Sequence, residues 1–404
     1  MLTRSVIALL AGAAMTVPAM GATETAVSQG QAEQAEQHYV PAIAPPDLRS
    51  SHSNERLAIF TPTSDPVRHA IDYEIWDYAL KNILISMGPS TRQGAPSPAP
   101  LTGSRIKSGP QSRYRLEGSL VLFRFFDKKV VESFTEYRED LERVAGTLDI
   151  AALPRNEQLA FWLNLHNVAM MEQIAKEWPV REPREITIGG EPLDEAKFIT
   201  LRGIPVSLRD IRENIVYRHW KDPKVIYGFW RGEIGMPHLQ AYAFTGANVG
   251  SLLDVAAADF VNSLRGTQKI YGKLAVSELY AEVAPFYFPD FETDVRAHLA
   301  GYAEESVVGL LAETDRTVAT IREYDIADLH GGARPPGILP VTSIPGDATN
   351  RPNCGERWGQ AACDVLYARA LKLQRMKRRD QPTGRVFFSN IDLPGDPPNK
   401  HAVK

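Results

Sequence analysis

Apolar residues recur along the chain in short periodic runs, and the strongest run covers residues 154–178. Its apolar positions are Leu159, Phe161, Trp162, Leu163, Leu165, Val168, Met170, Met171 and Ile174. They cover most of the circumference of a helix, which is typical of a helix buried at the centre of a fold. Pro154 suits a first helical turn, and Glu157 favours the positive end of the helix dipole. We therefore predict a central buried helix over residues 154–178.

Weaker periodicity predicts three more helices. Residues 67–87 carry an incomplete apolar stripe that ends at Gly88 and Pro89. Residues 249–264 have apolar positions at helical spacing before Gly266. A third helix begins at Ser207, which has capping-box spacing to Asp210. The charged residues at its start, Arg209, Asp210, Arg212 and Glu213, are interpreted as its solvated face.

Short apolar runs flanking turn residues predict strands. Residues 197–206 and 269–276 fit hairpins around Gly203 and Gly272, and residues 317–324 fit a single strand. Residues 225–230 are rich in β-branched and aromatic residues, which favours a buried strand. The predicted fold class is α+β, mainly helical with small antiparallel sheet elements around the central buried helix.

The two ends of the sequence differ from the middle. Arg4 precedes an apolar run over residues 6–14 and small residues at 19–22, which is typical of a secretory signal peptide rather than a membrane anchor. We expect a signal peptide at 1–21, a flexible lead-in at 22–66, a main domain at 67–330 with a Pro/Gly-rich loop at 88–112, and a C-terminal extension at 331–404. No cysteine suggests a lipobox and no later segment suggests a transmembrane span, so we expect a periplasmic or secreted protein.

The chain has two cysteines, Cys354 and Cys363, and both lie in the C-terminal extension. In an oxidising compartment this pair predicts a disulfide; the alternative is a reactive thiol, although neither residue belongs to a CxxC motif. Two cysteines also exclude a four-thiolate zinc or iron–sulfur site within one chain. The nine histidines are scattered, and no pair has the i, i+4 spacing of a helical metal site. We therefore expect neither a metal site nor a cofactor.

Overall charge points to no partner class. Lys and Arg number 45 against 49 Asp and Glu, a net charge of -4, so nothing favours nucleic acid as a partner. One local basic cluster comprises Lys372, Arg375, Lys377, Arg378 and Arg379. We interpret it as a solvated helix end, with contact to an acidic partner or to lipid headgroups as the alternative. The expected partner is an unknown envelope protein or a small ligand.

The candidate pocket combines two segments. Asn164, His166 and Asn167 interrupt the apolar surface of the central helix, so they either tie it to neighbouring loops or face a cavity. The second segment supplies Trp230, Arg231 and His238. A charged Arg231 after a buried run requires water, a carboxylate or a bound anion beside it.

The order of these motifs resembles that of a family named domain of unknown function 547. Residues 156–167 are similar to its hallmark segment, in which a Tyr commonly stands where His166 is, and residues 207–211, 253–262, 276–280 and 324–325 fit later pieces in the same order. The resemblance covers about residues 70–330. It implies a His, a Cys and a second Cys where this chain has Ile226, Arg231 and Met236. Thiolate chemistry requires a Cys with a base, so this member lacks those groups.

Two functions remain open from the sequence. The first is a non-catalytic exported protein of the bacterial envelope that binds a ligand or partner at a groove between the central helix and residues 225–238. The second is a hydrolase or transferase using His166, His219 or His238 with nearby carboxylates. Convergence of two of these histidines with an acid would favour the enzyme.

Overall fold

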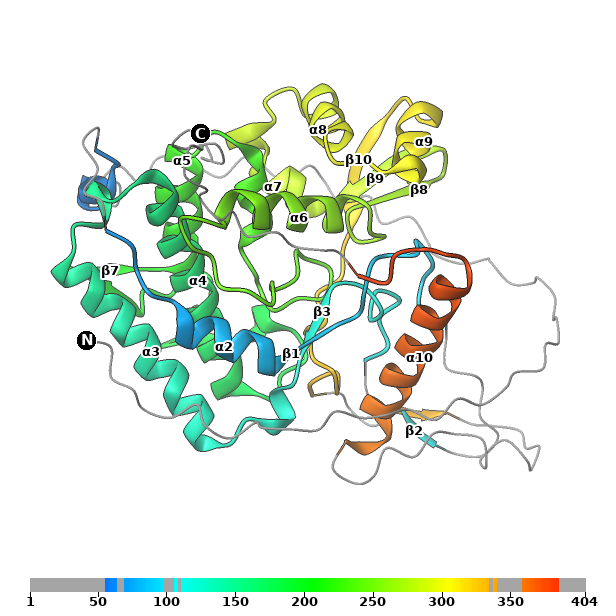
Figure 1. Cartoon of the computed structure of the whole chain (residues 1–404), viewed down its shortest axis with the longest axis horizontal. Coiled ribbons are helices and arrows are strands. Elements are labelled where there is room, and N and C mark those ends of the chain that lie inside the picture. The colour runs from blue at the N-terminus through cyan, green and yellow to red at the C-terminus, as the bar shows by residue number, and fades with distance from the viewer. Residues whose placement is uncertain are drawn as a thin grey trace.

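The helix predicted from the longest apolar run forms the centre of the molecule. In a computed structural model, which describes residues 55–63, 69–96, 105–107, 110–333, 337–339 and 358–384, this helix is α4 (Arg155–Glu177). It begins after Pro154 and is buried along almost its whole length, so this prediction is confirmed. Helix α3 (Lys128–Thr147) packs along one side of α4, and α6 (Val249–Val261) packs on another (Figure 1). This arrangement keeps almost every α4 side chain out of solvent.

The helix predicted over residues 67–87 is shorter than expected. Helix α2 covers only Glu74–Ile83, and the chain then continues directly as strand β1 (Leu84–Ser86). Strand β1 pairs antiparallel with β3 (Ser119–Val121), with Ile85 opposite Leu120. The prediction failed here because the strand partner lies more than thirty residues away along the chain, and a tertiary partner overrides local helical periodicity.

The two predicted hairpins are confirmed. Strands β6 (Ile199–Leu201) and β7 (Ile204–Val206) join through Arg202 and Gly203, both with positive φ. Strands β8 (Thr267–Ile270) and β9 (Lys273–Ser277) join through Tyr271 and Gly272 in the same way. Two successive residues with positive φ are what a type I′ hairpin turn requires.

The predicted strand at 317–324 is β10 (Thr317–Ile321), which pairs parallel with β9. Two further antiparallel pairs are β4 (Thr187–Ile188) with β5 (Glu191–Pro192) and β2 (Arg105–Lys107) with β11 (Gly337–Leu339). Small, mostly antiparallel sheets around a helical core confirm the α+β class.

The strand predicted at residues 225–230 is wrong. This segment is the 3₁₀ helix η6 (Pro223–Gly228), whose N-cap Asp222 accepts a hydrogen bond from the backbone of Lys224. Asp followed by Pro is a helix-start signal, and here it outweighs the strand propensity of the apolar residues. The segment is nevertheless buried, and Gly228 packs so closely on Leu163 that a Cβ would lie 2.7 Å from its Cδ2.

The capping box at Ser207 is confirmed, but the helix that follows is unusual. The Ser207 amide donates to Asp210 Oδ2 at 3.1 Å, and the Asp210 amide donates to Ser207 Oγ at 3.0 Å. The chain then forms a π-helix, η5 (Asp210–Val216), which passes into α5 (Tyr217–His219). The solvated face predicted for this helix is wrong for Asp210 and Arg212, which are only 6% and 1% exposed. A π-helix has more residues per turn than the 3.6 assumed, so the expected faces shift.

The remaining helices lie around the edge of the domain. Helices α7 (Glu278–Tyr287), α8 (Phe291–Ala300) and α9 (Glu305–Glu313) gather around the β8–β9–β10 sheet (Figure 1). Helix α10 (Gly359–Arg378) lies on the other side of that end of the molecule and buries Ala362 and Val365 in a second apolar cluster. Short 3₁₀ turns occur at η1 (Ala58–Phe60), η2 (Phe123–Phe125), η3 (Ile150–Ala152) and η4 (Pro183–Glu185).

Some predictions concern residues outside the described ranges. The signal peptide at 1–21 and Cys354 lie outside them, so the signal peptide and the disulfide stay predictions; Cys363 is buried on α10. Within the predicted lead-in, residues 55–63 are described, and Leu57 and Phe60 pack into the main core. None of the helices in the described ranges has the length and apolar character needed to cross a bilayer.

Candidate functional site

Two asparagines of α4 hold the chain that carries Arg231. Asn164 donates to the carbonyl of Phe244 at 2.7 Å and accepts from its amide at 3.1 Å. Asn167 donates to the carbonyl of Gly228 at 2.9 Å and accepts from the amide of Trp230 at 2.9 Å. Both side chains are buried and each both donates and accepts a backbone hydrogen bond, so they fasten residues 228–244 to the central helix.

His166 is the link between this framework and η5. The side chain is 0% exposed, and its ring meets Phe229 edge to face at 4.9 Å between centroids. Arg212 Nη1 lies 3.0 Å from His166 Nε2, and Asn167 Oδ1 lies 3.1 Å from Nδ1. Burial and the neighbouring Arg212 lower the pKa of His166 well below its usual value. His166 is therefore a neutral, positioned group in the interior.

Trp230 and Arg231 point to different places although they are adjacent. Trp230 is buried in the core, whereas Arg231 reaches an open cleft and forms an ion pair with Glu282 of α7 at 2.6 Å. Gly232 makes the turn between them and the next segment, with φ of 76°; a Cβ there would lie 2.2 Å from Ile174 Cδ1. Only glycine fits this turn, so the backbone itself fixes where Arg231 points.

Charged side chains dominate the cleft that Arg231 enters, which has a volume of about 520 Å³. We call it the arginine–carboxylate cleft. It is lined by Arg184, Arg209, Arg212, Arg231, Asp194, Glu195, Glu213, Glu233, Glu282, Met170, Pro183, Pro192 and Leu193. These residues come from α4, η4, the β5 end, η5, the loop after η6 and α7, so the cleft forms only in the folded domain.

Ion pairs hold most of these charges in place. Arg184 binds Glu233 through two hydrogen bonds, 2.7 Å from Nε and 3.0 Å from Nη2. Arg209 bridges Asp194 at 3.3 Å and Glu195 at 2.9 Å. Paired arginine and carboxylate groups form a rigid set of donors and acceptors, which is a preorganised surface for a polar ligand.

Arg212 is the most buried charge of the cleft. It is 1% exposed, and its Nη2 donates to Asp194 Oδ2 at 2.7 Å. Burial raises the pKa of Asp194, but Arg212, Arg231 and Arg209 together lower it far more, so this carboxyl group is ionised throughout the ordinary pH range. The Nε of Arg212 has no hydrogen-bond partner among the described residues. That N–H is itself buried, so it stays unsatisfied behind the cleft wall, and the guanidinium group acts on the cleft mainly through its charge and its bond to Asp194.

Two carboxyl groups of the cleft have raised pKa values. Burial raises the pKa of Glu233 to about 7, although Arg184 opposes this shift. Burial likewise raises the pKa of Glu213, whose ion pair with Arg209 is long, 3.9 Å from the Nε. A carboxylate that is desolvated and weakly paired favours a cationic or donor group from outside the protein.

The structure does not bring the predicted histidines together. His166 lies behind the cleft in the core; His238 lines a separate cavity of about 270 Å³ next to Arg265, where burial lowers its pKa to about 3. His219 ends α5, and burial lowers its pKa as well. Of the candidate pocket residues, Arg231 alone lines the arginine–carboxylate cleft, while Asn164, His166, Asn167 and Trp230 support it from the interior.

Most cleft residues were absent from the sequence prediction. The sequence predicts Arg212 and Glu213 on a solvated helix face. They line the cleft instead, because the π-helix η5 orients side chains differently from the α-helix that the prediction assumes. Asp194, Glu233 and Glu282 stand in segments with no recognisable motif. The mixed charges of residues 209–213 fit a solvated helix face equally well, so no local signal separated these cleft residues from the surface.

Comparisons with known proteins agree with the sequence resemblance. Residues 150–261 match the model of the family described as "Protein of unknown function, DUF547". This range contains α4, η5 and η6, and it supplies every charged cleft residue except Glu282. No curated protein and no solved structure matches the chain significantly.

Proposed function

Because residues 150–261 form a DUF547-like domain, we propose that this domain gives the chain a binding function. In this proposal the protein is exported to the bacterial envelope and binds a small polar ligand in the arginine–carboxylate cleft without transforming it. The ligand carries an anionic group, such as a carboxylate, and a cationic or hydrogen-bond-donating group.

The observation that carries the proposal is the convergence of four arginines and five carboxylates, Arg231 among them, on one cleft of about 520 Å³. A cavity of this size suits a small molecule, and a few convergent polar groups are typical of a ligand site. Arg231 reaches the cleft already paired with Glu282, and its planar guanidinium group has further N–H donors with which it can also bind a carboxylate of the ligand.

The acids of the cleft define the other end of the ligand. Four arginines face five carboxylates there, so the lining has a formal charge of 4 − 5 = −1. A simple anion would meet net repulsion, whereas a zwitterion can place its ammonium group on Glu213 and its carboxylate on the arginines. A free amino acid is the smallest molecule with this chemistry.

The lining also favours binding over catalysis. The described residues around the cleft include no Cys, Ser, Thr, His, Lys or Tyr, so carboxylates are the only side-chain nucleophiles among them, and most of these are held by arginines. Arg231 stands where the resemblance implies a Cys. The hydrolase or transferase alternative needs a convergence of histidines with an acid, and His166, His219 and His238 occupy three different surroundings.

Calorimetric titration of the full chain with a panel of free amino acids tests the proposal. Succinate and ethanolamine serve as ligands with one kind of charge. We expect one or more amino acids to bind, with Arg231→Gln weakening affinity about tenfold. Arg316→Gln changes an exposed arginine just before β10 and is expected to leave affinity within about twofold. Equal binding of succinate, or equal weakening by both variants, contradicts the proposal.

Export and the absence of catalysis are tested separately. N-terminal sequencing of protein from the envelope fraction is expected to find the mature chain beginning within a few residues of Gly21. A broad hydrolase panel is expected to show no activity; an activity lost in His166→Ala would instead favour an enzyme.

A further inference from the structure

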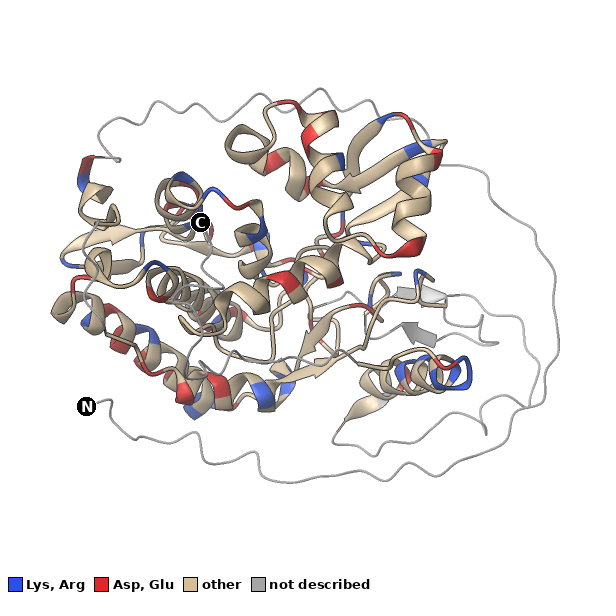
Figure 2. Ribbon diagram, turned by 45° about the horizontal axis from the view of Figure 1, so that its top comes forward, with Lys and Arg blue, Asp and Glu red and all other residues tan. Residues whose placement is uncertain are grey.

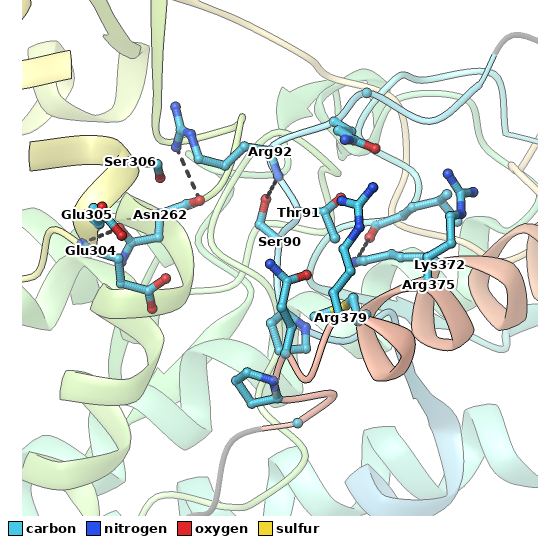
Figure 3. A pocket seen from close by; sticks show the side chains of 18 of the residues that line it. Ser90, Thr91, Arg92, Asn262, Glu304, Glu305, Ser306, Lys372, Arg375 and Arg379 are labelled. Atoms are coloured by element: carbon cyan, nitrogen blue, oxygen red, sulfur yellow. Dashed lines mark hydrogen bonds between the residues drawn. The ribbon is translucent and has the colours of Figure 1, made fainter. Parts of the chain in front are cut away.

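A second cavity, of about 440 Å³, lies between α10 and the loop after β1. It shares no lining residue with the arginine–carboxylate cleft. We call it the α10 pocket; the residues that matter for it are Thr91, Arg92, Glu304, Glu305, Arg375 and Arg379 (Figure 3). None of them belongs to the matched family region, so the pocket is a feature of this chain beyond that domain.

Arg375 and Arg379 form the cationic wall of the α10 pocket. They are four residues apart, so they lie on one face of the helix end, and both extend on the pocket side (Figure 3). Arg375 Nε donates to the carbonyl of Leu371 at 3.3 Å, which leaves its other guanidinium N–H groups available. Among the described residues, neither arginine forms an ion pair. Figure 2 shows the concentration of positive charge at this end of α10.

The helix that presents these arginines is fixed to the domain. Lys372, one turn earlier, is 6% exposed and donates to the carbonyls of Leu116 at 2.7 Å and Met87 at 3.1 Å. Arg369, a turn before that, donates to the carbonyl of Ser86 at 2.5 Å. The ammonium group of Lys372 is therefore occupied by the protein. Its role is to hold the wall in place, which lowers the ordering cost of binding.

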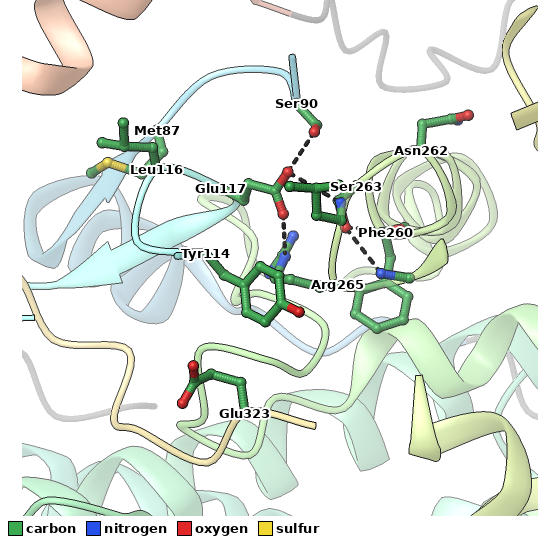
Figure 4. A network of polar contacts seen from close by, with 12 residues as sticks. Met87, Ser90, Tyr114, Leu116, Glu117, Phe260, Asn262, Ser263, Arg265 and Glu323 are labelled. Atoms are coloured by element: carbon green, nitrogen blue, oxygen red, sulfur yellow. Dashed lines mark hydrogen bonds and ion pairs between the residues drawn. The ribbon is translucent and has the colours of Figure 1, made fainter. Parts of the chain in front are cut away.

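The loop facing α10 is equally fixed. Ser90 Oγ donates to Glu117 Oε1 at 2.5 Å, and Arg92, at a left-handed φ of 54°, donates to the carbonyl of Thr267 at 2.8 Å. Figure 4 shows Glu117 between Ser90 and Arg265, whose Nε lies 3.7 Å from the carboxylate. Thr91, between these two anchors, is half-buried and lines the pocket with its hydroxyl group.

The third wall carries negative charge. Glu304 and Glu305 stand at the start of α9 and line the same cavity. Because the arginines and these two acids belong to different elements, the pocket has a positive end and a negative end (Figure 3). An anionic group is attracted to the α10 end only. At the other end the two acids favour hydrogen-bond donors of the ligand and repel further negative charge.

We propose that the α10 pocket is a second ligand site, which binds an oxyanion, a phosphate or a carboxylate group, between Arg375 and Arg379 with Thr91 as a hydrogen-bond donor. Two guanidinium groups that form no ion pair with any residue of the described ranges provide the fork of N–H donors that matches such oxygens. The site is independent of the proposed function, because it shares no residue with the cleft.

Titration of the full chain with inorganic phosphate and, separately, with acetate at constant ionic strength tests this site. The matched pair of variants is Arg375→Gln/Arg379→Gln and Lys377→Gln/Arg378→Gln, which remove the same charge from the same helix end; Lys377 and Arg378 are exposed and line no part of the pocket. We expect at least one probe to bind, about tenfold weaker in the first variant and within twofold in the second.

The two probes distinguish the chemical sources. If phosphate binds more tightly than acetate, the site is assigned to phosphate groups. If acetate binds more tightly than phosphate, it is assigned to carboxylates. A wild-type chain that binds neither probe, or an equal loss in both double variants, overturns the proposal. Glu305→Gln provides a gain-of-binding readout that misfolding cannot mimic, since removing this negative charge is expected to tighten binding about threefold. Arg231→Gln is expected to leave phosphate and acetate binding unchanged.

Discussion

Arg212 donates a hydrogen bond from Nη1 to Nε2 of His166 across 3.0 Å of buried interior. A guanidinium group can only donate, so His166 accepts at Nε2 and carries its proton on Nδ1, which donates to Asn167 Oδ1 at 3.1 Å. The same Asn167 oxygen accepts the amide of Trp230. A continuous chain of hydrogen bonds thus runs from Asp194 in the cleft to the backbone next to Arg231.

The first prediction concerns the pair of Asp194 and Arg212. Asp194→Asn is expected to lower the free energy of unfolding by about 2–3 kcal/mol, because it leaves Arg212 as a buried charge without its closest carboxylate. Arg212→Met is expected to cost a similar amount. In the double variant the loss is smaller than the sum, because neither charge is left unpaired.

Urea unfolding of the wild type and the three variants measures this coupling. Glu195→Gln is the matched control, since its ion pair with Arg209 is nearly half-exposed on both sides and is worth well below about 1 kcal/mol. Strict additivity of the two single variants would show that Asp194 and Arg212 do not act as a pair.

Asn167 is expected to be the most sensitive of the polar residues of α4. Asn167→Ala removes partners from the carbonyl of Gly228 and the amide of Trp230, and both are then left unsatisfied in the core. The expected loss of unfolding free energy is about 3 kcal/mol. Asn82→Ala on α2, whose amide donates to the Tyr78 carbonyl at an exposed position, is expected to cost less than about 0.5 kcal/mol. Similar losses in the two variants would contradict this account.

Local signals predicted the parts of the fold that depend on neighbours in sequence. The capping box of Ser207 and Asp210 formed as expected, and so did the turns at Gly203 and Gly272. In each case the stabilising contacts lie within a few residues. The central helix was also predictable, because a run apolar on all sides is stable only in an interior.

The arginine–carboxylate cleft depends on relationships that a linear pattern does not contain. Glu282 meets Arg231 across 51 residues, and Arg184 meets Glu233 across 49. Arg212 turned inward because η5 is π-helical, and neither composition nor a 3.6-residue period predicts an i→i+5 ladder. The sequence did single out three polar residues of α4: Asn164, His166 and Asn167. They lie behind the cleft and support it, because a polar residue inside a buried helix indicates buried hydrogen bonding and does not indicate contact with a ligand.

Acid stability is expected to depend on His298. Its Nε2 forms a hydrogen bond with Tyr227 Oη at 2.7 Å, the rings stack, and burial lowers the pKa of His298 from its ordinary 6.5 to about 4. The folded state therefore binds this proton less readily than the unfolded chain. The stability contributed by neutral His298 is complete above pH 6.5 and is lost as the pH falls toward 4.

His298→Gln keeps a hydrogen-bonding group for Tyr227, since an amide can donate or accept, and it cannot titrate. Between pH 6.5 and 4, its unfolding free energy is expected to fall by about 2–3 kcal/mol less than that of the wild type, measured by urea unfolding at each pH. His69→Gln, at an exposed position, is expected to follow the wild type. A wild type and a His298→Gln variant with parallel pH profiles would show that protonation of His298 is not linked to unfolding.

The attachment of α10 is expected to depend on Lys372. Lys372→Ala leaves the carbonyls of Leu116 and Met87 without their donor, at a cost of about 1–3 kcal/mol, and it frees the helix that carries Arg375 and Arg379. Because α10 meets the domain mainly along this face, the loss is expected to appear as local opening rather than global unfolding. Hydrogen exchange is expected to show faster exchange of the α10 amides while the α4 amides keep their protection.

Lys377→Ala, five residues further along and exposed, is the control and is expected to leave the exchange of the α10 amides unchanged. Equal acceleration in both variants would show that charge at the helix end, rather than the buried ammonium group of Lys372, holds α10 to the domain.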